Sequence, residues 1–303
     1  MEKSKCRGML VGLAVGDALG TTLEFKQRGS FEPIETIIGG GPFSMKPGRW
    51  TDDTSMTLCL ADSLIEKNDF DATDQMEKYI DWYRNGYNSS DGGCFDIGLT
   101  TRNALMRFED TGEAYSGSDN PRTAGNGSIM RLAPVVIKYF KNTGELLQFA
   151  ALSSKTTHAA PEAVQSCMLL ALYLKAFVEN HDKEYILSNE FISEVQRLIP
   201  DLEPKVDNIL QGSYASKTEN QIVSSAYCIA TLEAALWAFY HGADFRETLL
   251  KAVNLGDDAD TVGAVTGQLA GAFYGYENIP ADWRKTLYLE PEIADRADAL
   301  LKI

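Results

Sequence analysis

Two short segments concentrate the side chains that could do chemistry. Gly256–Thr261 holds three carboxylates and a hydroxyl directly before an apolar run, and Thr51–Thr54 places two carboxylates between two threonines before another. Capping of free N–H groups explains one Asp at a helix start, but neighbouring carboxylates repel one another unless a cation lies between them. Oxygen ligands suit Mg²⁺ or Mn²⁺ better than zinc. The two segments therefore indicate one site for two divalent cations.

Glycines recur at every fourth position in the two helical segments that should carry this site. They are Gly8, Gly12, Gly16 and Gly20 in the first segment, and Gly263, Gly267 and Gly271 in the second. A helix-interior glycine costs about 1 kcal/mol relative to alanine, so each stripe needs a reason, and close helix contact is one. We expect the stripes to meet and to bring Asp17 and Glu24 towards Asp258 and Asp260. Two tightly packed central helices without any site would explain the stripes equally well.

Helical periodicity dominates the rest of the chain, and alternating strand patterns are almost absent. Helices are predicted over residues 1–24, 54–67, 73–84, 97–108, a run through 136–139, 143–154, 159–179, 188–198, 218–240, 244–254, 262–274 and 290–301. Residues 26–50 are rich in Gly and Pro and are expected to form a loop or lid. With no repeat or linker, the pattern favours an all-α fold: one domain over residues 1–303, a compact orthogonal helical bundle with a central cleft.

The composition excludes some partners. A formal net charge of −15 disfavours non-specific binding to nucleic acid or to an anionic membrane. No targeting segment is recognised, and the apolar runs are judged too short or too interrupted to span a bilayer. The five scattered cysteines form no C-x-x-C pair, which is typical of reduced thiols in a cytoplasmic protein.

A glycine-rich segment, Gly125–Ser128, precedes another predicted helix. Its free backbone N–H groups could hold a phosphate. It is not a Walker loop, because no Gly-Lys-Ser/Thr follows, and no strand precedes it as a dinucleotide-binding loop would require. Arg131, three residues later, could serve a phosphate or a buried carboxylate.

Several motifs occur together in the order of a known family. They are Gly16–Gly20 with Glu24, Trp50–Thr54, Cys94–Gly98, Gly125–Arg131, Thr157-His158, Ser225–Tyr227 leading into Leu232–Trp237, and Gly256–Thr261. With them the chain closely resembles the ADP-ribosylglycohydrolase family, which includes the enzyme that releases ADP-ribose from nitrogenase reductase. The resemblance extends from Gly8 to about Ala272.

The resemblance implies roles for individual residues. Two divalent cations, Mg²⁺ or Mn²⁺, would be held by Thr51, Asp52, Asp53, Asp258, Asp260 and Thr261. ADP-ribose would contact Asn126, Gly127, Ser128, Met130, His158 and Tyr227, with Tyr214 or Tyr227 stacking on adenine. The candidate catalytic carboxylates are Glu24, Asp96 and Asp53. A helix starting at Thr261 would leave Asp258 and Asp260 in a turn that points both carboxylates inward, with Asp257 as a supporting or surface charge.

Purely structural roles are the alternatives for three of these residues. Glu24 could be an exposed carboxylate at a helix end, and Asp96 could cap a helix that begins at Ile97. His158 could be a capping or packing residue instead of a phosphate or adenine contact.

The resemblance also implies the reaction. The protein would be a metal-dependent enzyme that hydrolyses the N-glycosidic bond between ADP-ribose and a modified protein side chain. Arginine is the expected acceptor, because Cys94–Gly98 matches the nitrogenase-reductase type. Alternatives are serine-linked or small-molecule ADP-ribose conjugates, an ADP-ribose reader or immunity-type protein without turnover, and a two-metal phosphoesterase. An ADP-ribosylated protein or conjugate is the expected partner, and the chain is expected to be a monomer.

Overall fold

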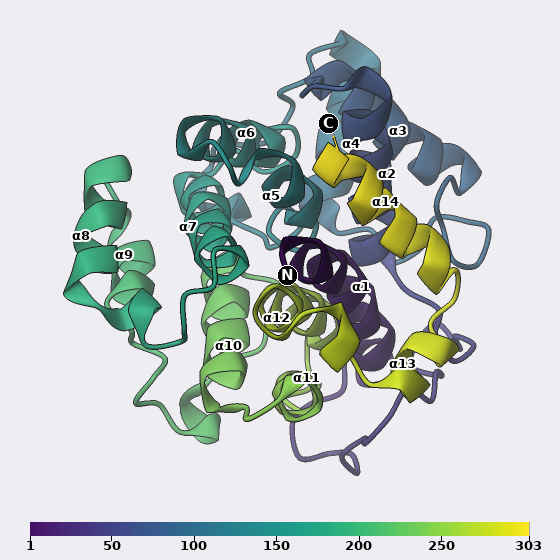
Figure 1. Ribbon diagram of the computed structural model, residues 1–303. Coiled ribbons are helices and arrows are strands. Elements are labelled where there is room, and N and C mark those ends of the chain that lie inside the picture. Colours follow the sequence, from purple (N-terminus) through teal and green to yellow (C-terminus); the bar gives the residue numbers. More distant parts are fainter. Residues whose placement is uncertain (303) are drawn as a thin grey trace.

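Two glycine-striped helices, α1 (Glu2–Gly20) and α12 (Ala259–Tyr274), lie side by side at the centre of the computed structural model, which describes residues 1–302 (Figure 1). They run antiparallel, because Gly8 faces Gly271 and Gly16 faces Gly263. A Cβ atom on Gly16 would lie 2.0 Å from the carbonyl oxygen of Gly263. The predicted meeting of the two stripes is confirmed.

The direction of this contact determines where a site can form. The antiparallel arrangement places the carboxyl end of α1 beside the amino end of α12, and Gly20 packs against the backbone of Ala259. Asp17 and Glu24 therefore reach Asp260, as the sequence predicted. For example, Oε2 of Glu24 accepts a hydrogen bond of 3.4 Å from the backbone N–H of Asp260.

The other helices surround this central pair. They are α2 (Asp52–Lys67), α3 (Ala72–Asn85), α4 (Leu99–Thr111), α5 (Ala133–Tyr139), α6 (Thr143–Lys155), α7 (Pro161–Val178), α8 (Asn189–Leu198), α9 (Pro204–Leu210), α10 (Cys228–His241), α11 (Phe245–Val253), α13 (Ala281–Thr286) and α14 (Glu290–Lys302). Within residues 1–302 there is no strand, and the only β pairing consists of three isolated bridges. The all-α prediction is confirmed.

Some helix boundaries differ from the prediction. The helix predicted from residue 218 begins only at Cys228, because Thr218 and Gln221 cap a short 3₁₀ turn and the backbone before Cys228 pairs with Gly125 instead. The short helices α9 and α13 were not predicted. Helix α12 begins at Ala259 and not at Thr261, so Asp260 lies in its first turn and Asp258 is its N-cap.

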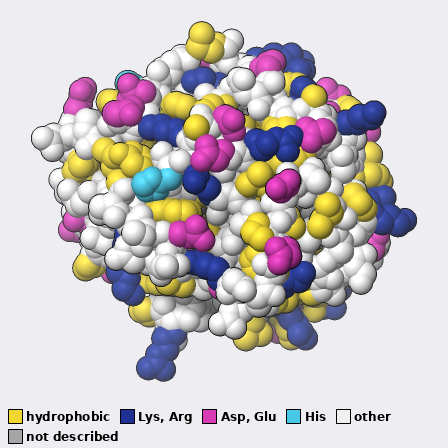
Figure 2. All heavy atoms as spheres, turned by 90° about the horizontal axis from the view of Figure 1, so that it is seen from below, with side chains coloured by type: hydrophobic (Ala, Val, Ile, Leu, Met, Phe, Trp, Pro, Cys, Tyr) yellow, Lys and Arg dark blue, Asp and Glu magenta, His cyan; other side chains and the backbone are white. Residues whose placement is uncertain are grey.

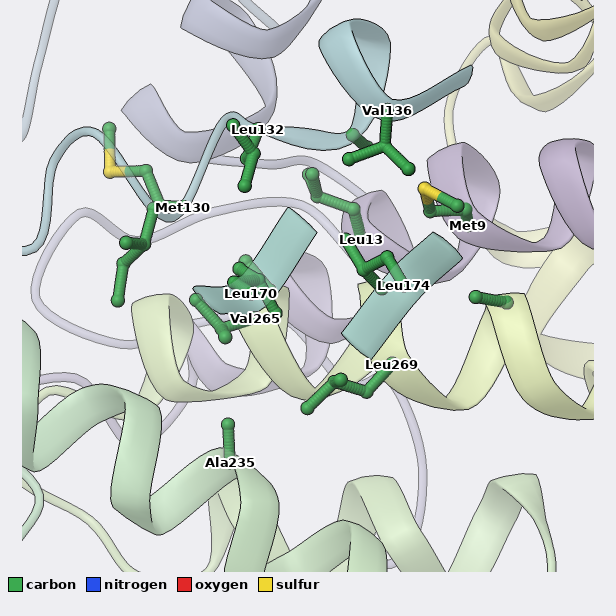
Figure 3. Close-up of a cluster of buried hydrophobic side chains, with 14 of the residues drawn as sticks. Met9, Leu13, Met130, Leu132, Val136, Leu170, Leu174, Ala235, Val265 and Leu269 are labelled. Atoms are coloured by element: carbon green, nitrogen blue, oxygen red, sulfur yellow. The ribbon is translucent and has the colours of Figure 1, made fainter. Parts of the chain in front are cut away.

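The buried hydrophobic side chains form one continuous cluster. Figure 3 shows its centre, where side chains of α1, α7 and α12 meet. By length and composition α7 could cross a membrane, contrary to the expectation that the apolar runs are too short or too interrupted to do so. Of its 18-residue apolar window, however, 72% is buried inside the structure, as in the core helix of a folded domain.

Figure 2 shows one face of the molecule, on which acidic and basic side chains are interspersed with small hydrophobic areas. On this face the acidic excess of the chain is not gathered into one region, and no continuous basic area is present among the described residues.

The α1–α12 contact leads to a stability prediction. Substituting Gly267→Ala puts a Cβ atom 2.0 Å from the carbonyl oxygen of Gly12, so the helices must separate. We expect the free energy of unfolding to fall by about 1–3 kcal/mol or more, as overpacking does elsewhere. Gly144→Ala is the matched control, because its nearest neighbour would be Asn142 Oδ1 at 3.4 Å. Equal effects of the two substitutions in urea unfolding would contradict this account of the contact.

Candidate active site

A cleft of about 370 Å³ opens where the carboxyl end of α1 meets the amino end of α12. One part of its lining is acidic and consists of Glu24, Asp52, Asp96, Asp258 and Asp260. Another part is contributed by Gly125, Asn126, Gly127, Met130, His158 and Ala226. No Lys or Arg lines the cleft among the residues that the structure describes. The two acidic segments of the sequence thus reach one site together with the glycine-rich segment.

Asp17 holds the start of α2 in place from another helix. Its Oδ1 accepts from the N–H and the hydroxyl of Thr51, each at 2.9 Å, and its Oδ2 accepts from the N–H of Thr54 at 2.9 Å and its hydroxyl at 2.6 Å. A carboxylate offers about four lone-pair positions, so these donors use all of them. Asp17 therefore acts as a helix cap between two helices, and it fixes Asp52 and Asp53 relative to α1.

The hydroxyl of Thr51 lies among more carboxylate oxygens than it can serve. Its oxygen is 2.9 Å from Asp17 Oδ1, 3.1 Å from Asp53 Oδ2 and 3.2 Å from Asp260 Oδ2. A hydroxyl carries one hydrogen, so two of these close contacts lack a proton between the oxygens. Such crowding is repulsive unless positive charge is present.

Asp53 also lacks a proton donor for one of its oxygens in the described part of the chain. Its Oδ1 is buried and has no hydrogen-bond partner within residues 1–302. Two sets of carboxylates have ligand oxygens within 4.8 Å of one another, Asp17 with Asp53 and Asp260, and Glu24 with Asp258 and Asp260. Free carboxylate and hydroxyl oxygens are the ligands that hard divalent cations prefer. The donor set therefore fits Mg²⁺ or Mn²⁺.

The pKa values report the same lack of positive charge. Burial, together with the nearby Asp260, raises the pKa of Asp17 and of Asp258 to about 7 each. Burial also raises the pKa of Asp52 and Asp53 well above the usual range, with the neighbouring carboxylates as the second cause. Without a cation, the folded protein would keep protons on several of these groups near neutral pH.

Glu24 is held at the cleft by its neighbours in the chain. Phe25 N–H donates to the carbonyl of Asp257 and Asp257 N–H donates to the carbonyl of Lys26, both at 2.7 Å. Phe25 and Asp257 have φ values of +60° and +53°, in the left-handed region. Asp257 thus contributes its backbone N–H and carbonyl to holding the segment that carries Glu24. Glu24 is 3% exposed, so its interpretation as an exposed helix-end carboxylate is wrong; burial followed by the charge of Asp260 raises its pKa.

Asp96 lines the cleft from the segment before α4. Its φ is +59°, and the N-cap of α4 is Gly98, so Asp96 does not cap this helix. Burial and the nearby Asp260 raise the pKa of Asp96 to about 9. Without a cation in the cleft, a carboxyl group with this pKa carries a proton at neutral pH.

The glycine-rich segment is joined to the acidic side of the cleft. The side-chain amide of Asn126 donates to Asp258 Oδ2 at 2.6 Å and to Thr231 Oγ1 at 2.9 Å, which leaves only its Oδ1 for a ligand. The backbone N–H groups of Gly127 and Ser128 have no acceptor among the described residues. The following helix begins only at Ala133, so a phosphate held by this segment would be bound by loop N–H groups and not by a helix end.

Three predicted substrate contacts have side chains that do not line the cleft. The hydroxyl of Ser128 lies against Ser154 Oγ at 2.9 Å, buried below the cleft. Tyr227 does not line the cleft, although Ala226 does, and its hydroxyl contacts Glu162 and Lys205. Tyr214 is completely buried and has no free ring face for adenine.

Arg131 serves neither a phosphate nor a carboxylate, and so differs from both interpretations of the sequence. Its side chain is completely buried. The guanidinium donates to the carbonyl of Gly127 and, at 2.7 Å, to Thr157 Oγ1. Arg131 therefore holds the glycine-rich segment against the segment that carries His158.

This contact also determines which nitrogen of His158 carries the proton. Thr157 Oγ1 accepts from Arg131 and lies 2.8 Å from His158 Nδ1, the one acceptor within reach of its own hydrogen in the described part of the chain. The hydroxyl therefore donates to Nδ1, which leaves the proton on Nε2. Burial, followed by the charge of Arg131, lowers the pKa of His158 to about 3. His158 is thus a neutral Nε2–H donor at the cleft.

Several cleft residues were not predicted from the sequence. Phe25 and residues 97–101 line it, together with Ala226. Phe25 could have been suspected, because it directly follows Glu24. Ile97, Gly98 and Ala226 lie in motifs that carried the resemblance, although no role was assigned to them there. Residues 99–101 are ordinary apolar and hydroxyl residues whose types and spacing carry no chemical signal.

The raised pKa of Asp258 predicts how stability depends on pH. The carboxyl of Asp258 ionises near pH 4 in the unfolded chain and near pH 7 in the folded protein. The stabilisation that its bound proton gives the folded state is therefore complete below about pH 4 and is lost as the pH rises towards 7. With divalent cations chelated, the Tm of Asp258→Asn should therefore rise relative to that of the wild type by about 2 °C or more as the pH increases from 4.5 to 7.5. The control Asp257→Asn keeps the buried carboxyl of Asp258, so its difference from wild type should vary less with pH than that of Asp258→Asn. A pH-independent difference for Asp258→Asn would contradict the prediction.

The tautomer of His158 is also testable. Thr157→Val removes the hydroxyl that donates to Nδ1, whereas Thr157→Ser keeps it. Losing a hydrogen bond worth about 1 kcal/mol should shift the tautomer ratio about fivefold away from Nε2–H in the valine variant only. The ¹⁵N chemical shifts of His158 measure this ratio, and the chain contains only three histidines. An unchanged ratio in the valine variant would refute the assigned relay.

Comparisons with known proteins agree with this geometry. The chain is 45% identical to an ADP-ribosylarginine hydrolase of Serratia proteamaculans (strain 568), over 98% of this chain and 78% of that protein. It is 32% identical to the ADP-ribosyl-[dinitrogen reductase] glycohydrolase of Rhodospirillum rubrum, over 98% and 95% of the two chains. A solved structure titled "ADP-ribosylglycohydrolase-related protein complex" superposes with a TM-score of 0.87 at 42% identity, covering 99% of this chain and 98% of that one.

The sequence profile described as ADP-ribosylglycohydrolase matches residues 2–303. The resemblance noted in the sequence is thereby confirmed over the whole chain. The protein belongs to the ADP-ribosylglycohydrolase family and is an enzyme that hydrolyses glycosidic bonds.

Proposed function

We propose that this enzyme releases ADP-ribose from arginine side chains and depends on divalent cations. The observation that carries the proposal is that a cation-deficient carboxylate cluster and a loop of free N–H groups share one cleft. Relatives from Serratia proteamaculans and Pseudomonas putida that are 45% and 43% identical are named ADP-ribosylarginine hydrolases. This supports arginine as the acceptor.

The cations would be held by carboxylate and hydroxyl oxygens of the two acidic segments, among which Asp53 Oδ1 is buried without a partner in the described part of the chain. The proposed ligands are Thr51, Asp52, Asp53, Asp258, Asp260 and Thr261. When bound, two Mg²⁺ or Mn²⁺ ions would supply Lewis acidity and the positive charge that this cluster lacks. Asp17 is not included, because four donors already use its oxygens.

The remaining lining orients the substrate. The free N–H groups of Gly127 and Ser128 and the Nε2–H of His158 are donors suited to the pyrophosphate. Asn126 joins this side to Asp258, so the pyrophosphate and the neighbouring ribose would span from the loop to the carboxylates. The acceptor side chain would then lie beyond Glu24 and Asp96.

The reaction breaks the bond between the anomeric carbon and the guanidine nitrogen and forms a bond from that carbon to a water oxygen. The carbon develops oxocarbenium character, which the surrounding carboxylates stabilise. One proton of the water passes to a carboxylate and ends on the departing guanidine. Glu24 and Asp96 are placed for this transfer, since both line the cleft.

Activity of the purified protein tests the proposal. With Mn²⁺ or Mg²⁺, the wild type should release intact ADP-ribose from ADP-ribosylagmatine, and chelation should abolish the release. Glu24→Gln and Asp96→Asn should each lower kcat by about 10²–10⁴-fold if they transfer the proton. Asp257→Asn should change kcat by less than about threefold.

Other outcomes would favour other functions. Binding of ADP-ribose without any turnover would favour a reader, and AMP as product would favour a phosphoesterase. Release only from a serine-linked conjugate would refute arginine as the acceptor. Near-wild-type kcat in both Glu24→Gln and Asp96→Asn would refute their proposed roles.

A further inference from the structure

Three phenylalanines from separate segments pack in a row, and one of them, Phe25, lines the cleft. Phe25 packs edge to face on Phe43, with ring centroids 6.3 Å apart, and Phe43 packs on Phe95 with centroids 5.3 Å apart. We call these residues the aromatic rim. Phe43 belongs to the loop over residues 26–50, and this contact joins that loop to the segment before α4.

Phe25 is the member of the rim that lines the cleft, and it is 67% exposed. Exposure of a phenylalanine forgoes about 1.5–3 kcal/mol of hydrophobic stabilisation. The ring is nevertheless held in place from two directions. Its backbone donates to the carbonyl of Asp257, and Phe43 supports the ring. The open ring is therefore a positioned feature of the cleft.

The rim lies at the carboxylate end of the cleft. Phe25 directly follows Glu24 and Phe95 directly precedes Asp96, and both carboxylates line the cleft. The pyrophosphate donors Gly127 and His158 belong to the other part of the lining. If the proposed function is correct, the acceptor side chain leaves the ribose at the end where Phe25 presents its ring.

Charge narrows the choice of acceptor. The cleft is lined by five carboxylates and by no Lys or Arg in the part of the chain that is described. A cationic group gains from an exposed aromatic face, whereas a neutral acceptor does not. The aliphatic neighbour Leu99, 71% exposed and also lining the cleft, offers no such face.

We propose that the exposed face of Phe25, supported by Phe43 and Phe95, holds the guanidinium of the ADP-ribosylated arginine. Phe25 would thereby select cationic over neutral acceptors. The inference rests on the proposed function and adds a specificity-determining residue to it. The guanidinium contacts the ring before, during and after bond cleavage, so the contact should affect KM and leave kcat unchanged.

Two substitutions of the same residue separate the aromatic face from simple packing. Phe25→Leu keeps an apolar side chain and loses the ring, whereas Phe25→Tyr keeps the ring. A cation–π contact at an exposed site is worth about 0.5–1 kcal/mol. The KM for ADP-ribosylagmatine should therefore rise about 2–5-fold in Phe25→Leu and stay near wild type in Phe25→Tyr. The inhibition constant of free ADP-ribose should stay unchanged in both, because it lacks the guanidinium.

Tyr115→Leu is the matched control, since Tyr115 is a 50% exposed aromatic residue that does not line the cleft. Its KM should equal that of the wild type, and equal Tm values should show that all variants are folded. Equal KM values for Phe25→Leu and wild type, or a parallel change in the inhibition constant of ADP-ribose, would overturn the role of Phe25. Failure of the wild type to cleave ADP-ribosylagmatine would instead refute the proposed function, and this role with it.

Discussion

The close contact between α1 and α12 is the constraint on which the rest of the structure depends. Glycines on both helices allow backbone to meet backbone, and added Cβ atoms would lie about 2 Å from the facing carbonyl oxygens. Each glycine weakens its helix by about 1 kcal/mol relative to alanine. In return, the antiparallel contact brings the end of α1, and with it Glu24, to the start of α12 at Asp260. Without this approach the carboxylates would not share a cleft.

Sharing a cleft creates an electrostatic problem that hydrogen bonds offset most fully at Asp17. Four donors from Thr51 and Thr54 satisfy that carboxylate. Asp53 keeps a buried oxygen without a partner, and backbone strain gathers nearby, with positive φ at Asp96 and Asp257. Strain and unsatisfied charge persist where the surrounding structure imposes them. Their concentration around one cleft distinguishes a reactive site from a set of capped helices.

The sequence predicted those features that lie within one helix or one short segment. Apolar periodicity located most helices, and the spacing of Gly8 to Gly20 predicted the central contact. The predicted start of the helix near Cys228 was wrong, because the backbone before this helix pairs with Gly125, about a hundred residues away in the sequence. The short helices α9 and α13 were missed, since six or seven residues carry little periodic signal.

The roles of polar residues were harder to predict, because a residue type does not reveal its partners. Arg131 was expected near a phosphate or a carboxylate, yet its partners are two backbone carbonyls and the hydroxyls of Thr156 and Thr157. Through the hydroxyl of Thr157 it determines the protonated nitrogen of His158, a property that involves three side chains. Ser128 has the right type for a phosphate contact, but its hydroxyl faces the core. Residue type and spacing thus locate a site, while the chemical state of its groups depends on neighbours that only the folded chain brings together.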